Sequence, residues 1–281
     1  MITDIHSHTW PFPAAFSEDF IKQASSARPG TTVDLTVTYD AYRAGAPADT
    51  KTVVFGGKAR LSGVWVEDQY VADYVAKDTE HLIGFLSIDP TQDGWEDELR
   101  QGHGELGLRG VKLLPMYAGF GVNEERLEPL WRYCEAHQLP VLLHTGTTFV
   151  RQAPLEFTLP RLIEPVALKH PDIKFVLAHL SHPYEHECVV TIRKHPNVFS
   201  DISALHYRPW QLYNSLMLVQ EYGVWDKVLF GSDYPFTTVN ASIEGLRALN
   251  KMVEGTNLPR LDENGIESLI HRNGFQLLGL E

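Results

Sequence analysis

Short, almost continuously apolar runs recur eight times along the chain, and most of them end in a polar or charged residue. The runs cover residues 2–8, 52–55, 82–89, 110–115, 140–144, 173–179, 198–203 and 228–233. Strands of a parallel sheet are covered on both faces and therefore read as continuous apolar runs, whereas half-exposed strands alternate. We therefore predict eight buried strands in parallel arrangement.

Amphipathic segments separate these runs. Apolar residues recur at helical spacing over residues 68–78, 127–137, 159–170 and 243–253. Strands that alternate with helices, joined by right-handed crossovers, fit most simply into an α/β fold of the closed TIM (β/α)8 barrel type. The 281 residues suit one such barrel, and no linker or internal repeat divides them. We predict a single domain over residues 1–281.

The segment between the first and second predicted strands is the least regular part of the chain. It covers residues 10–51 and contains four prolines, with a predicted helix near residues 16–24. A segment that follows a barrel strand belongs to the face where catalytic groups gather. We expect this excursion to serve as a lid or a dimer contact.

The charge balance narrows the classes of partner. Lys and Arg number 24 and Asp and Glu 36, so the formal charge is 24 − 36 = −12. Nucleic-acid binding needs a basic face, which this balance argues against, but a locally placed cation still allows a small anionic substrate. The apolar runs are too short to span a bilayer, and no secretory signal pattern follows Met1. We expect a cytoplasmic protein without membrane contact, and a homodimer is the default for its undetermined oligomeric state.

Histidines and an aspartate stand at the ends of several predicted strands. His6 and His8 end the first strand, His144 the fifth, His179 the sixth and Asp233 the eighth. The carboxyl ends of barrel strands converge on one mouth, and residues at i and i+2 of a strand share a face. Imidazoles and a carboxylate suit zinc and related divalent ions. The sequence therefore predicts a metal site at this mouth.

Several motifs resemble those of the amidohydrolase superfamily, in particular its amidohydrolase-related branch. They are DIHSH (4–8), GVKLLP (110–115), VLLHTG (141–146), VLAHLSH (176–182), GSDYPF (231–236) and the terminal ESLIHRNGFQLLGL (267–280). The branch contains hydrolases of cyclic esters and amides, and also non-oxidative decarboxylases such as the aminocarboxymuconate-semialdehyde and resorcylate enzymes. The resemblance implies a barrel enzyme, and it leaves the choice between these two reactions open.

The same resemblance implies roles for individual residues. His6, His8, His144 and Asp233 would be metal ligands, and Asp233 would also transfer a proton. His179 would be a catalytic residue beside the metal-bound water, or a ligand of a second metal. We expect one divalent ion, zinc by its ligand types, with manganese or a second metal as alternatives.

Three cations are candidates for substrate binding. Lys112 lies on the fourth predicted strand, where two-metal members of the superfamily carry a carboxylated lysine. We favour an unmodified lysine that binds a substrate anion or forms a pocket ion pair. Arg60 and Arg208 follow the second and seventh strands, and either a substrate carboxylate or a solvated ion pair would explain them. Asp201, on the seventh strand, is predicted to orient a metal-bound histidine.

These observations support three hypotheses of function. The first is a metal-dependent hydrolase that acts on a small, carboxylated lactone, ester or amide, with Asp233 as general acid and base. The second is a metal-dependent decarboxylase of an aromatic or muconate-like acid. The third is a catalytically silent barrel that binds a small molecule or a partner protein. Loss of a metal-binding residue would favour this hypothesis, and all the expected metal-binding residues are present.

Overall fold

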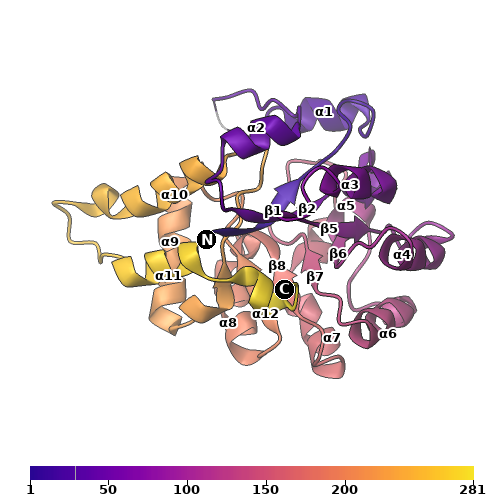
Figure 1. The fold of residues 1–281 in the computed structure, drawn as a ribbon. Coiled ribbons are helices and arrows are strands. Elements are labelled where there is room, and N and C mark those ends of the chain that lie inside the picture. The colour runs from indigo at the N-terminus through magenta and orange to yellow at the C-terminus, as the bar shows by residue number, and fades with distance from the viewer. Residues whose placement is uncertain (29) are drawn as a thin grey trace.

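Eight parallel strands form the centre of the molecule and pair in the order in which they occur along the chain. The computed structural model describes residues 1–28 and 30–281, and its central sheet has the order β1-β2-β5-β6-β7-β8-β9-β10 (Figure 1). The strands are β1 Thr3–His8, β2 Lys51–Phe55, β5 Leu82–Ser87, β6 Val111–Leu113, β7 Val141–Leu143, β8 Phe175–Leu177, β9 Val198–Asp201 and β10 Val228–Leu229. Each strand overlaps one of the eight apolar runs, so the predicted strands and their parallel arrangement are confirmed.

The segment after β10 brings the last strand back to the first. The Asp233 amide donates to the His6 carbonyl over 2.8 Å. The His8 amide donates to the Tyr234 carbonyl over 2.9 Å. These bonds leave a nearly closed barrel, and the predicted TIM-barrel fold is confirmed.

Apolar side chains fill the interior of the barrel. This inner cluster includes Ile5, Val53, Phe55, Phe85, Leu142, Val176, Leu229, Phe275 and Leu278. The last two belong to the C-terminal helix, where the Gly274 amide donates to Thr3 Oγ1 over 2.9 Å at the start of β1. The C-terminal helix therefore closes the end of the barrel opposite the predicted site, and that end serves stability.

Helices surround the strands (Figure 1). They are α3 Asp68–Val75, α4 Trp95–Gly104, α5 Pro115–Ala118, α6 Glu128–Ala136, α7 Glu164–Lys169, α8 Glu185–Lys194, α9 Pro209–Tyr222, α10 Val239–Ala248, α11 Glu263–His271 and α12 Gly274–Leu278. The helix predicted over residues 159–170 divides into a 3-10 turn, Pro160–Ile163, and α7. No helix in the described part of the chain is both long and apolar enough to span a membrane.

The excursion between β1 and β2 carries two short helices, α1 Glu18–Ala24 and α2 Tyr39–Ala44, which lie together at the top of Figure 1 (indigo). The Ser17 hydroxyl caps α1 by accepting the Phe20 amide over 3.2 Å, and Thr38 caps α2 in the same way. The helix predicted near residues 16–24 is confirmed.

A small antiparallel hairpin after β2 was not predicted from the sequence. It consists of β3 Lys58–Ala59 and β4 Val64–Trp65. Lys58 is buried, and its Nζ lies 2.9 Å from a carboxylate oxygen of both Asp68 and Glu98. Each strand has only two residues, which is too short for an alternation of apolar and polar positions to be recognised in the sequence.

Candidate metal centre

The strand ends bring the predicted histidines and aspartate to one place. His6 Nε2 lies 3.3 Å and His8 Nε2 lies 3.2 Å from Asp233 Oδ1. One potential ligand atom from each of His6, His179 and Asp233 lies within 4.8 Å of the others, and all three residues are buried. The residues come from β1, from the turn after β8 and from the loop after β10, as the barrel topology requires.

A buried carboxylate fixes the orientation of His6. The His6 Nδ1–H donates to Asp201 Oδ2 over 2.8 Å, so that the Nε2 atom keeps its lone pair. This Nε2 atom is buried and makes no hydrogen bond to any described residue. The arrangement is the one in which a carboxylate orients a metal-binding imidazole, and it agrees with the role predicted for Asp201.

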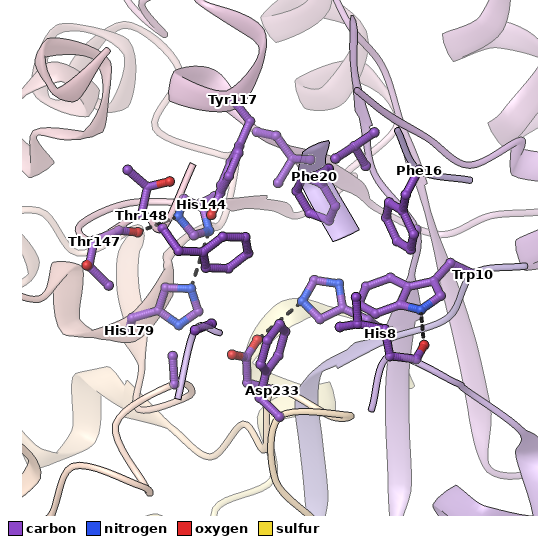
Figure 2. A pocket seen from close by; sticks show the side chains of 18 of the residues that line it. His8, Trp10, Phe16, Phe20, Tyr117, His144, Thr147, Thr148, His179 and Asp233 are labelled. Carbon is purple, nitrogen blue, oxygen red and sulfur yellow. Dashed lines mark hydrogen bonds and ion pairs between the residues drawn. The ribbon is translucent and has the colours of Figure 1, made fainter. Parts of the chain in front are cut away.

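A second chain of hydrogen bonds fixes the ring of His179. The Ser203 hydroxyl donates to Asp201 Oδ1 and accepts from His179 Nδ1, whose distance to Ser203 Oγ is 2.8 Å. His144 donates its Nε2–H to the Thr147 carbonyl over 3.0 Å. The free lone pairs of His179 Nε2 and His144 Nδ1 therefore face each other at 3.4 Å (Figure 2), a pairing that an ion or a proton would satisfy.

Strained backbone aims two of these side chains. His179 and Asp233 have φ values of 64° and 60°, in the left-handed region that costs non-glycine residues free energy. The His179 amide is held by Asp201 Oδ1 at 2.9 Å. Asp4 anchors the turn before Asp233, because its carboxylate accepts both the amide and the hydroxyl of Ser232, at 2.9 and 2.6 Å.

Burial keeps the imidazoles neutral. Burial, with a smaller effect of the Lys112 charge, lowers the pKa of His6 to about 3. Burial also lowers the pKa values of His8, His144 and His179 below the usual range. Burial alone would raise the pKa of Asp233, but the hydrogen bond from His8 is the largest of the opposing effects, which together hold it well below its ordinary value. Neutral imidazoles beside one carboxylate are the donor set that a divalent ion requires, so the residues present fit such an ion.

The metal centre opens into a pocket with mostly apolar walls. The empty space in the pocket, including open solvent at its mouth, is about 870 Å³. Its lining includes His8, His144, His179 and Asp233 together with aromatic side chains (Figure 2). The excursion between β1 and β2 contributes Trp10, Phe16, Phe20, Ala27 and Leu35. This segment thus forms part of the pocket wall, and its expected use as a lid or a dimer contact stays a prediction.

The three predicted substrate-binding cations have different positions. Arg208 lines the pocket. Arg60 does not, because it is exposed on a short 3-10 turn, where its guanidinium carbon lies 3.7 Å from the centre of the Trp65 ring. Lys112 is fully buried in the barrel interior, and its Nζ lies 4.5 Å from the centre of the Phe55 ring. Its Nζ makes no hydrogen bond to the described residues and does not line the pocket.

Replacing Lys112 with methionine is expected to raise the melting temperature by a few degrees. Burial lowers the pKa of Lys112 to about 7, although the charges of Asp201 and Asp233 raise it. Below the folded-state pKa of about 7, the folded protein carries the full free-energy cost of burying the lysine charge. This cost disappears as the pH rises toward 10.5, the ordinary pKa of lysine. Urea unfolding at about pH 6 and about pH 10 would therefore show a larger gain at the lower pH. A variant less stable than the wild type at the lower pH would contradict this expectation.

Ser203 and Asp4 were not predicted from the sequence, although a signal for both was present. Ser203 follows Asp201 by two positions, and Asp4 precedes His6 by two. Residues at this spacing in a strand share a face. A polar residue two positions from a predicted metal ligand, or from the carboxylate that orients such a ligand, is therefore a candidate hydrogen-bond partner of that residue.

Comparison with known proteins places the chain in a family. The family model described as amidohydrolase matches residues 3–279. An uncharacterized TIM-barrel protein from Bordetella bronchiseptica has a similar structure, with a TM-score of 0.73 and 19% identity over 99% of this chain and 98% of that one. A probable 2-pyrone-4,6-dicarboxylic acid hydrolase from Acinetobacter baumannii, with citric acid bound, has a TM-score of 0.66 and 14% identity over 99% of both chains.

A third similar structure is a decarboxylase. A mutant of 5-carboxyvanillate decarboxylase from Novosphingobium aromaticivorans, with manganese and 3-methoxy-4-hydroxy-5-nitrobenzoic acid bound, has a TM-score of 0.66 and 13% identity over 100% of this chain and 97% of that one. At these identities, the likeness shows the shared fold. The search of curated proteins gave no match. Because the family model spans nearly all of the sequence, the chain belongs to the amidohydrolase family.

Proposed function

We propose that this protein is a metal-dependent hydrolase of a small lactone, ester or amide that carries a carboxylate. The observation that carries the proposal is the position of Asp233, whose Oδ1 lies within 3.3 Å of two histidine nitrogens and whose side chain lines the pocket. A carboxylate so placed can remove a proton from water and deliver it to a leaving group.

The residues that would hold the ion follow from the geometry. His6, His179 and Asp233 form the tightest group, and His8 and His144 supply further nitrogen donors beside it. His179, expected beside the ion as a catalytic residue, is in this arrangement one of the candidate ligands. A bound divalent ion would polarise the substrate carbonyl and lower the pKa of water, and zinc or manganese suits these donors.

The remaining chemistry belongs to the chain itself. Asp233 accepts a proton from the attacking water and returns it to the leaving oxygen or nitrogen as the carbonyl–heteroatom bond breaks. Arg208 pairs with the substrate carboxylate from the pocket wall. The apolar side chains of the excursion exclude bulk water from the reacting bond.

Product analysis in oxygen-18 water tests the proposal. The metal-loaded protein is incubated with a panel of lactones, esters and amides that each bear one carboxylate, and mass spectrometry follows the products. Hydrolysis adds one labelled oxygen to the acid product and leaves the number of carbon atoms unchanged. Turnover without uptake of label would contradict the proposal.

A decarboxylase is the second candidate, and the aromatic pocket lining favours it. Seven aromatic residues line the cavity, namely Trp10, Phe16, Phe20, Tyr117, Phe149, Tyr207 and Phe236. Such walls suit a planar aromatic acid. Release of CO2 from aromatic acids, with no labelled oxygen in the aromatic product, would establish this reaction in place of hydrolysis.

A further inference from the structure

One wall of the pocket is a continuous aromatic surface. The ring centres of Trp10 and Phe16 lie 5.0 Å apart, and those of Phe16 and Phe20 lie 4.9 Å apart in a stacked arrangement. Phe20 reaches Phe149, from the loop after β7, at 5.7 Å. Figure 2 shows Trp10, Phe16 and Phe20 beside one another along this wall, and the contact with Phe149 joins the excursion to the loop after β7. Aromatic faces pack well against flat, apolar rings and offer no hydrogen bonds to charged groups.

Formal charge is scarce in this pocket. With the histidines neutral, Asp233 and Arg208 are the charged side chains among the described residues that line it. The Arg208 Nε is buried and makes no hydrogen bond to any described residue. Arg208 and Arg28 lie 5.4 and 5.1 Å from the centre of the Tyr207 ring. Arg28 donates its Nη1–H to the Phe236 carbonyl over 3.0 Å and does not line the pocket, so Arg208 is the cation left for a ligand.

We propose that the pocket selects compounds with a flat, conjugated body and one anionic group in addition to the group that reacts. This inference rests on the proposed function and specifies its substrate class. One carboxylate would pair with the Arg208 guanidinium, which can make two parallel hydrogen bonds to it. A neutral compound would leave the buried Arg208 Nε without a partner. A second carboxylate would lie against the aromatic walls, where an unpaired charge is costly.

Binding of three compounds that share one ring tests the proposal. Benzamide, 4-carboxybenzamide and 5-carbamoylisophthalate carry no, one and two carboxylates beside the same amide, and calorimetric titration into the zinc-loaded protein measures their dissociation constants. We expect 4-carboxybenzamide to bind at least about tenfold more tightly than either of the others, since a hydrogen bond to a charged group has this effect. Arg208→Met should remove this preference, so that the three dissociation constants differ by less than about threefold.

Two variants control for charge and for folding. Arg132→Met removes a charge from an exposed position on α6 and should bind all three compounds as the wild type does. Arg208→Lys keeps the charge without the planar fork, so it should retain the preference for one carboxylate at lower affinity. This variant also tests the proposal if Arg208→Met does not fold. Equal or tighter binding of the dicarboxylate, a preference that persists in Arg208→Met, or no binding of any of the three would overturn the proposal. Because these experiments measure binding, the proposed ligand preference can be confirmed even if the proposed hydrolysis is not observed. Equally, hydrolysis can be observed without this preference.

Discussion

Replacing Asp233 with asparagine is expected to lower turnover by at least about a hundredfold, because the amide cannot accept the proton that the reaction removes from water. The side chains are nearly equal in shape, so the backbone hydrogen bond between Asp233 and His6 should persist. The change also removes the negative charge that lies 3.2 Å from His8 Nε2 and 3.3 Å from His6 Nε2. The affinity for a divalent ion should therefore fall together with turnover.

Activity and metal content are measured on the same samples. Steady-state rates give the loss of turnover, and elemental analysis gives the ion bound per chain, with circular dichroism to confirm folding. Asp97→Asn is the matched control, because Asp97 is exposed on α4 and pairs only with Arg100 among the described residues. Full activity in Asp233→Asn would show that Asp233 does not transfer the proton. A loss that saturating metal restores would show that it acts as a ligand alone.

The placement of the site at the strand ends could be predicted, because the strands of a barrel lie side by side in the order of the sequence and their carboxyl ends meet at one mouth. His6, His144 and Asp233 are far apart in the chain, yet each lies at or near the end of an apolar run, and the strands that carry these runs converge. The same reasoning is weaker for residues in loops. Arg60 and Arg208 both follow strands, but the hairpin that begins at Lys58 holds Arg60 against Trp65, outside the pocket.

The fine geometry of the centre could not be predicted, because it depends on backbone torsions and on hydrogen bonds between distant strands. The left-handed conformation of His179 places its ring beside His144, and no residue type in its neighbourhood indicates that turn. The hydroxyl of Ser203 connects His179 to Asp201, a link that appears only when the strand ends are in register. Lys112 shows a second limit, because its position on a strand could be predicted from the sequence, whereas its absence from the pocket lining could not.

Replacing Asp201 with asparagine is expected to weaken metal binding by about 10- to 100-fold, the usual effect of losing the carboxylate behind a ligating histidine. Asp201 accepts the Nδ1–H of His6 over 2.8 Å, which keeps the lone pair on Nε2, where an ion would bind. An asparagine amide can donate to Nδ1 instead, and this favours the tautomer with its proton on Nε2. Titration of the metal against a competing chelator measures the change.

The response to added metal distinguishes this variant from Asp233→Asn. Asp201 lies behind His6 and does not line the pocket, so excess metal should restore most of the turnover of Asp201→Asn, whereas Asp233→Asn should stay inactive. Ser203→Ala keeps the Asp201 carboxylate and removes only the hydroxyl between Asp201 and His179, so its metal affinity should fall less. An Asp201→Asn protein with wild-type metal affinity would show that the tautomer of His6 is set by other groups. Equal inactivity of both aspartate variants at saturating metal would show that Asp201 acts on the reaction and not through His6.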